Sequence, residues 1–253
     1  MDKQSSELYG VMEVCMTAGK IMLQSGAETY RVEDTMSRIA SAFGLEKSHS
    51  YVVPTGIIFT VEDGGPGITK LIRISQRSTD LQKVTLVNAV SRRISNGEID
   101  LNEAANLLAG IDEMSHTFPL AMQTAAASFA SGCFMIMFNG VWMDFIPALI
   151  AGALGFLTVS YLEEIVPIKF FAEFCGSLVI GIVSYLLVKA GFGVQLDTII
   201  IGSVMPLVPG LLLTNAVRDL IAGHLVAGIS KGGEAALTAF AIGSGVAIVL
   251  MLL

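Results

Sequence analysis

Residues 206–219 read Pro206-Leu207-Val208-Pro209-Gly210-Leu211-Leu212-Leu213-Thr214-Asn215-Ala216-Val217-Arg218-Asp219, and this stretch decides how the rest of the chain is interpreted. Proline removes a backbone donor and clashes with the preceding turn, so we expect a helix here to bend or break. An amide, a guanidinium and a carboxylate follow within about one helical turn. Freed backbone groups in a membrane are tolerated only beside protein or water. The pattern therefore fits a transport site, and equally a kinked helix whose polar end reaches the membrane surface.

The composition divides the chain into two parts, one rich and one poor in charged residues. The chain has 253 residues, 53% of them hydrophobic, and a mean hydropathy of +0.69, which is too apolar for an ordinary soluble domain. Residues 1–118 hold 26 of its charged residues and residues 119–253 hold 11. We therefore predict a cytoplasmic α+β domain over 1–118 and an α-helical transmembrane domain over 119–253. The net charge of −7 argues against nucleic acid as a partner.

The first 118 residues predict a small α+β domain of order ααββαα. Apolar residues at helical spacing predict a first helix, then a second from about 27 to 43. A β region follows, with a bend at Pro54-Thr55-Gly56 and a hairpin turn at residues 63–67. Two more helices complete the order, and the residues expected to cap them are Thr79 or Asp80 and Asp100.

The start of the second helix is densely charged. Four side chains stand there at spacings that suit ion pairs and the helix dipole: Glu28, Arg31, Glu33 and Asp34. By these rules alone the stretch is a well-solvated helix start.

The sequence contains none of the motifs GxxxxGK, HExxH or GxSxG, and no nucleophile–base pair is evident. The three cysteines are not spaced for a metal, and we expect buried thiols: Cys15, Cys133 and Cys175. We predict no cofactor, no metal and no enzymatic activity. The amino terminus has no basic segment leading into an apolar core, so no secretory signal is expected.

Five apolar runs predict five membrane-spanning helices. They cover about 119–138, 145–162, 168–188, 198–217 and 235–253, and the fourth contains both prolines. Residues 220–230 are apolar but short, so we expect them at the membrane interface or re-entering it. Asp144 is expected in water at the outer boundary, and Lys231 at the interface. Glu173 lies about one turn into the third span and either functions there or snorkels to the inner interface.

The orientation follows from the basic residues near the span ends. With the amino terminus in the cytoplasm, internal loops hold Lys169, Arg218 and Lys231, and external loops hold only Lys189. Five spans then place the carboxyl terminus outside.

Four segments, taken in order, resemble the threonine/serine exporter family and its split, five-span form, the YjjP-like proteins. They are residues 25–34, Pro54-Thr55-Gly56, residues 205–210, and Thr214-Asn215-Ala216 with Arg218, Asp219 and Gly223. The resemblance covers nearly the whole chain and implies a multi-pass exporter in the bacterial plasma membrane, driven by the proton-motive force. It implies small hydrophilic substrates, either threonine and serine or a dicarboxylate such as succinate. Because the chain is similar to the amino-terminal half of longer members, it also implies a second small membrane subunit, YjjB-like, or a homo-oligomer.

Within this family, the broken helix and its polar end become candidates for the translocation path: Pro206, Pro209, Gly210, Asn215, Arg218, Asp219 and Glu173. The break would expose backbone dipoles to a charged substrate group. Arg218 would attract a carboxylate, and Asp219 or Glu173 would take up protons. The cluster of Glu28, Arg31, Glu33 and Asp34 becomes a candidate cytoplasmic gate or partner contact. Two other functions stay open: a membrane-anchored, hydrolase-like enzyme, and a sensor or assembly subunit that does not transport.

Overall fold

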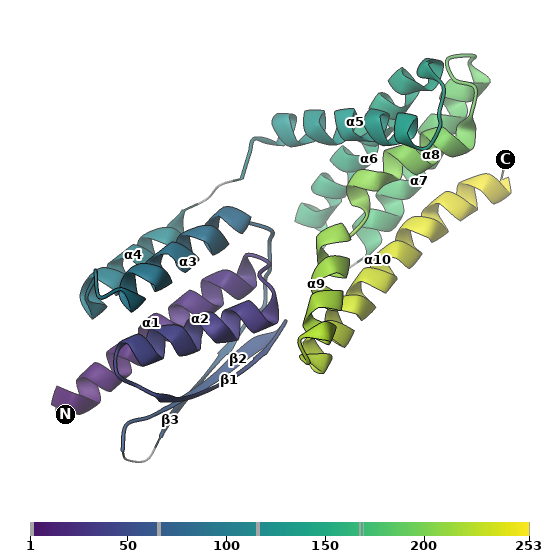
Figure 1. Ribbon diagram of the computed structural model, residues 1–253. Helices are drawn as coiled ribbons and strands as arrows, with labels where there is room; N and C mark the ends of the chain where they lie inside the picture. Colours follow the sequence, from purple (N-terminus) through teal and green to yellow (C-terminus); the bar gives the residue numbers. More distant parts are fainter. Residues whose placement is uncertain (1–2, 65–66, 115–116, 167, 169, 253) are drawn as a thin grey trace. The chain divides into compact units, whose positions relative to one another are not determined.

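The structure, a computed structural model, describes residues 3–64, 67–114, 117–166, 168 and 170–252 (Figure 1). The chain divides into two compact units. The first unit comprises residues 1–117 together with 213–232, and the second comprises 118–212 together with 233–253. The assignment of 1–118 to the cytoplasm and of 119–253 to the membrane stays a prediction.

The first unit has a layered α+β core. Its helices are α1 (Lys3–Gln24), α2 (Thr29–Ala42), α3 (Leu81–Ser95) and α4 (Leu101–Glu113). Its antiparallel sheet has the order β1-β2-β3, formed by β1 (Lys47–Val53), β2 (Gly56–Glu62) and β3 (Ile68–Arg73). Helices α1 and α2 lie between the sheet and the α3–α4 pair (Figure 1). Because α1 is covered on both sides, most of its residues between 11 and 23 are buried.

The inner face of the sheet supplies the other half of this core. Ile57, Phe59 and Val61 alternate along β2 and are fully buried against the helices. Gly19 of α1 permits the close approach, because a Cβ there would lie 2.5 Å from the sulfur of Met36 in α2. The outer face carries an exposed cross-strand row in which Tyr51 pairs with Ile58 and Ile58 with Leu71.

Several local predictions for this unit are confirmed. The Asp80 carboxylate accepts a hydrogen bond from the Lys83 N–H (3.0 Å), and the Asp100 carboxylate accepts one from the Glu103 N–H (2.8 Å). The predicted order ααββαα is wrong by one strand. The bend at Pro54-Thr55 is a two-residue turn between paired strands, since Val53 pairs with Gly56, and the order is ααβββαα.

The remaining elements form the helices of the second unit and the segment that returns to the first. They are α5 (Leu120–Met137), η1 (Trp142–Asp144), α6 (Phe145–Ile165), α7 (Phe171–Lys189), α8 (Leu196–Val204), η2 (Met205–Leu207), α9 (Gly210–Ile221) and α10 (Leu225–Leu252). Four helices of the described chain are long and apolar enough to cross a membrane. A fifth crossing is possible if the pair Leu196–Leu207 and Gly210–Ile221, bent by 62°, counts as one span. The chain is therefore a helical multi-pass membrane protein.

The break predicted in the fourth span is present. Residues 205–209 interrupt the helix between α8 and α9, where Pro206 and Pro209 cannot donate backbone hydrogen bonds. The short segment expected at 220–230 does not exist as a separate element. Its first residues end α9, and α10 begins at Leu225 and runs for 28 residues.

Small residues bring the helices of the second unit together. Gly155 of α6 and Gly176 of α7 face each other, and a Cβ on either glycine would lie 3.1–3.3 Å from the carbonyl oxygen of the other. A Cβ on Gly202 of α8 would lie 2.7 Å from the backbone nitrogen of Met135 in α5. Such contacts are how helices pack closely in lipid.

Two expectations about single residues are wrong. Asp144, expected in water, is fully buried, and its carboxylate accepts hydrogen bonds from the N–H groups of Val194 (2.6 Å) and Gln195 (3.2 Å). These two donors compensate for the lost water and hold the α5–α6 turn against the loop before α8. All three cysteines are free, but only Cys15 is buried, whereas Cys133 is exposed on α5 and Cys175 is half-buried.

Candidate functional site

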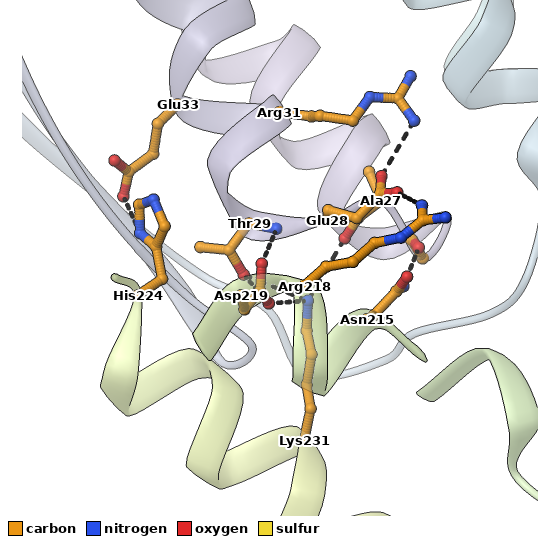
Figure 2. A network of polar contacts seen from close by, with 11 residues as sticks. Ala27, Glu28, Thr29, Arg31, Glu33, Asn215, Arg218, Asp219, His224 and Lys231 are labelled. Carbon is orange, nitrogen blue, oxygen red and sulfur yellow. Dashed lines mark hydrogen bonds and ion pairs between the residues drawn. The ribbon is translucent and has the colours of Figure 1, made fainter. Parts of the chain in front are cut away.

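A network of polar contacts lies within the first unit, where the start of α2 meets the end of α9 and the start of α10 (Figure 2). Its members are far apart in sequence, since Thr29 and Asp219 are separated by 190 positions. The turn at Gly223, whose φ of +88° suits glycine, reverses the chain between α9 and α10 and brings both helices to α2.

Asp219 is the centre of this network and is fully buried. Its carboxylate accepts hydrogen bonds from the backbone N–H and from the hydroxyl of Thr29, each at 2.9 Å. Glu28 occupies the N-cap position of α2 but makes no capping bond with its side chain. Asp219 therefore caps α2 from a distant part of the chain, at the end where the helix dipole favours a negative charge.

Lys231 is the buried cation of the network. Its ammonium lies 2.7 Å from Asp219, 3.2 Å from the hydroxyl of Thr29 and 3.5 Å from the carbonyl oxygen of Ala27, and the residue is 4% exposed. These contacts match the three donors of an ammonium group. The interfacial position of Lys231 stays a prediction, but its ammonium is enclosed by protein, where Asp219 on the preceding helix compensates its desolvation.

Asn215 completes the buried part of the site. Its amide donates a hydrogen bond to the carbonyl oxygen of Gly26 at 2.9 Å, and the residue is 5% exposed. The amide thus satisfies a carbonyl in the tight turn that leads into α2.

Glu28 connects the buried part to the surface. One of its carboxylate oxygens accepts from Arg218 and the other from Arg31 at 3.0 Å, as the spacing of Glu28 and Arg31 predicts. Burial acts to raise the pKa of Glu28, but a backbone hydrogen bond and the guanidinium groups of Arg218 and Arg31 outweigh it and hold the pKa below its usual value. Glu28 is therefore ionised at neutral pH.

Glu33 lies beside this network, whereas Asp34 does not. Glu33 accepts a hydrogen bond from the Val52 N–H at 2.9 Å, and His224 Nδ1 lies 3.7 Å from the same oxygen. Burial raises the pKa of Glu33, and the hydrogen bond from Val52 and the charge of His224 offset this only in part. Asp34 points to the surface and pairs with Arg38. The four charged residues at the start of α2 thus do not form one cluster.

The other predicted path residues belong to the second unit. A cavity of about 440 Å³ lies where α6 ends, α7 begins and α8 breaks from α9. Glu173 and Pro209 line it together with Glu163 and Glu234, while Pro206 lies in η2 and Gly210 is the first residue of α9. The predicted path therefore divides into a cavity group in one unit and a buried network in the other. Within the part of the chain that the structure describes, no group of three or more His, Cys, Asp or Glu side chains could hold a metal ion.

Sequence reasoning missed Thr29 and Lys231 as members of the site. A lysine followed by two glycines resembles the end of a span, and a threonine in a first turn resembles any helix start. The one available signal was the cost of a carboxylate in an apolar helix, which requires a cation or several donors elsewhere in the chain.

Apolar helices of spanning length, a bent helical pair and a compact α+β unit define a multi-pass membrane protein of mixed architecture. Residues 13–253 match the family described as "Putative threonine/serine exporter", and the chain belongs to this family. The resemblance seen in the sequence is thereby confirmed.

Individual relatives differ in how much of their length the chain covers. The chain is 24% identical to the "Probable succinate transporter subunit YjjP" of Klebsiella aerogenes, over 99% of this chain and 96% of that protein. It is 25% identical to the "Threonine/serine exporter" of Corynebacterium glutamicum over 98% of this chain but 52% of the relative. It is 23% identical to the "Probable threonine/serine exporter" of Mycobacterium tuberculosis over 89% of this chain and 43% of the relative. No solved structure matches the chain.

Proposed function

We propose that this chain is one subunit of a secondary-active exporter of small hydrophilic metabolites in the bacterial plasma membrane. The observation that carries the proposal is the pattern of coverage: the chain spans nearly all of a protein named as a transporter subunit, but about half of the exporters. A second small membrane subunit, YjjB-like, then supplies what the other half supplies in those exporters. Threonine and serine, or a dicarboxylate such as succinate, are the substrates to test.

The proton-motive force is the proposed energy source. The sequence has no GxxxxGK loop with which to bind a nucleotide, and an ion gradient needs only a group that takes up and releases protons. Glu173 is our candidate for that group, since it lines the cavity beside the bend. The bend contains Pro206 and Pro209, which have no backbone N–H, and the backbone at this bend, up to Gly210 at the start of α9, would face the passing substrate.

We assign different roles to the residues of the buried network. Asp219 and Asn215 already have their hydrogen-bond partners and are buried, so they hold the start of α2 in place and act as the fixed part of a gate. Arg218 has a side chain that is 59% exposed and is the member available to an incoming carboxylate. Glu28, Arg31 and Glu33 belong to the same gate on the α2 side.

The test is efflux of labelled threonine, serine and succinate from loaded cells that express this chain alone or with its partner. We expect efflux only when both proteins are present. Asn215→Ala, Arg218→Ala and Asp219→Asn variants that insert at normal levels should lose it. Full activity of these variants would contradict the gate. Absence of efflux with both proteins inserted would contradict the substrate class and favour an enzyme or a sensor.

A further inference from the structure

Two guanidinium groups from distant parts of the chain converge on one carboxylate. Arg31 stands in the first turn of α2 and Arg218 near the end of α9, and Figure 2 shows both directed at Glu28. The Glu28 side chain is 7% exposed, whereas those of Arg31 and Arg218 are 38% and 59% exposed. The carboxylate is therefore enclosed while the outer sides of both guanidinium groups face solvent.

The Glu28 side chain does not cap α2, although a polar side chain at this position usually caps the helix. It stands at the N-cap of α2 with an extended backbone (φ −65°, ψ 141°), yet its side chain makes no capping bond. Asp219 does the capping, through both the N–H and the hydroxyl of Thr29. The two oxygens of Glu28 are thus left for Arg31 and Arg218, one oxygen for each.

The two arginines have more binding capacity than Glu28 uses. A guanidinium has five N–H donors, and among the described residues Arg31 and Arg218 each make a single ion pair, through one nitrogen. Lys231 and Asp219 balance each other, whereas at Glu28 two guanidinium groups meet a single carboxylate, so positive charge is in excess at that point. An arginine pair with free donors and excess positive charge is suited to a planar, two-oxygen anion.

We propose that Arg31 and Arg218 form a binding site for the carboxylate of the exported metabolite. The Glu28 carboxylate occupies this site when no ligand is bound, and the ligand displaces it. This rests on the proposed function, because the ligand is the exported compound. Threonine, serine and succinate share the carboxylate that the site recognises. Because Glu28 competes for the site, the apparent affinity for the ligand equals the intrinsic affinity multiplied by the fraction of molecules in which Glu28 has left the site.

The experiment measures ligand binding directly, by titration calorimetry on the full chain purified with its partner. The ligands are threonine and succinate, with threoninamide and succinamide as analogues that lack the carboxylate. We expect the acids to bind and the amides to bind at least about tenfold more weakly, as the loss of charge-assisted hydrogen bonds requires. Arg31→Gln and Arg218→Gln should each weaken binding of the acids by a similar factor.

Glu28→Gln distinguishes this site from a structural ion pair. It removes the competing charge but leaves the cap by Asp219 intact, so we expect acids to bind several-fold more tightly than to the wild type. Lower thermal stability is expected of this variant on either account, so the affinity decides: a purely structural Glu28 predicts no gain in affinity. The matched control is Arg93→Gln, because Arg93 is another partly exposed, ion-paired arginine of this unit, and its partners Glu98 and Glu103 lie outside the network.

The outcomes separate this inference from the proposed function. If efflux occurs with the partner but the affinity is unchanged in the Arg31, Arg218 and Glu28 variants, the carboxylate site is overturned and the exporter is not. Carboxylate binding that follows the three variants, without any efflux, supports the site and overturns the exporter. An Arg93→Gln effect as large as that of Arg218→Gln overturns the site, because the arginines would then act through general charge.

Discussion

Asp219 and Lys231 form a buried ion pair, and removal of one partner leaves the other charged and without water. Asp219→Asn keeps an acceptor for Thr29 but takes the charge away from Lys231, and we expect a loss of about 3–5 kcal/mol in the free energy of unfolding. Thermal and denaturant unfolding in detergent would measure it. Asp112→Asn is the control, because Asp112 pairs with Lys20 at 3.0 Å with about a third of each side chain exposed. Its loss should stay below about 1 kcal/mol.

A double variant separates the buried charge from other effects at this position. Asp219→Asn combined with Lys231→Met removes both charges, so most of the lost stability should return. If the two losses simply add, the pair is not the source of the destabilisation.

The carboxyl groups at the start of α2 predict opposite pH dependences. Glu28 has a pKa below its ordinary value of 4.5, so its contribution to stability is complete above that pH and is lost as the pH falls through the lower value. Glu33 has a raised pKa, so its contribution is complete below pH 4.5 and is lost as the pH rises through the raised value. At pH 7 we expect Glu28→Gln to unfold at a lower temperature than the wild type and Glu33→Gln at a higher one. Both differences in unfolding temperature should shrink below pH 4.5. A Glu33→Gln variant that is destabilised at pH 7 would contradict the raised pKa of Glu33.

The local part of this site could be predicted from the sequence, and the distant part could not. The spacing of Glu28 and Arg31 predicts their ion pair, and Arg218-Asp219 stands out because charges are costly in an apolar helix. The bond from Thr29 to Asp219 crosses 190 positions, and no local pattern encodes it. Asp34 shows the limit of spacing rules, since it has Arg31 and Arg38 within reach and pairs with Arg38.

Helices α5 and α8 pack closely because residue 202 of α8 is glycine and has no side chain. A Cβ at Gly202 would lie 2.6–2.7 Å from the backbone nitrogen, Cα and Cβ of Met135, atoms that cannot move without shifting the helix. Gly202→Ala should therefore destabilise the second unit by about 1–3 kcal/mol, as overpacked cores do. Gly243→Ala in α10 is the control, because no atom lies within 4 Å of the Cβ it would add. Equal melting temperatures for the two variants in detergent would contradict this account.

The helix boundaries show what apolar patterns can and cannot predict. Pro206 and Pro209 predict the break between α8 and α9 because proline acts through its own backbone. The apolar pattern predicts the last span from residue 235, ten residues after α10 begins, because Lys231 and the glycines after it resemble the end of a span. The helix continues through Lys231 because Asp219 neutralises that charge, which is a tertiary effect.

Across the whole molecule, the assignment of residues 213–232 to the first unit could not be predicted from composition. Residues 213–232 are apolar and follow a span, yet they belong to the compact unit of residues 1–117. Their inward side carries Asn215, Asp219 and Lys231, which find partners at the start of α2. Their other side exposes Val217, Ile221, Leu225 and Ile229. The mean hydropathy of residues 213–232 is dominated by their apolar side chains, so it gives no indication of the buried polar residues.

The number of crossings decides where the chain ends, and this can be measured. Four helices are long and apolar enough to cross on their own, and the bent pair either crosses as a fifth or re-enters on the side from which it came. With the amino terminus in the cytoplasm, five crossings place the end of α10 outside and four place it inside. We expect five, because Arg218 and Lys231 would then both lie at the inner surface, as basic residues near span ends prefer. Alkaline phosphatase fused after residue 253 should be active and green fluorescent protein at the same position dark, while the fluorescent protein fused to the amino terminus should be bright. The reverse pattern at the carboxyl terminus, with the amino-terminal fusion still bright, would make the bent pair a re-entrant loop.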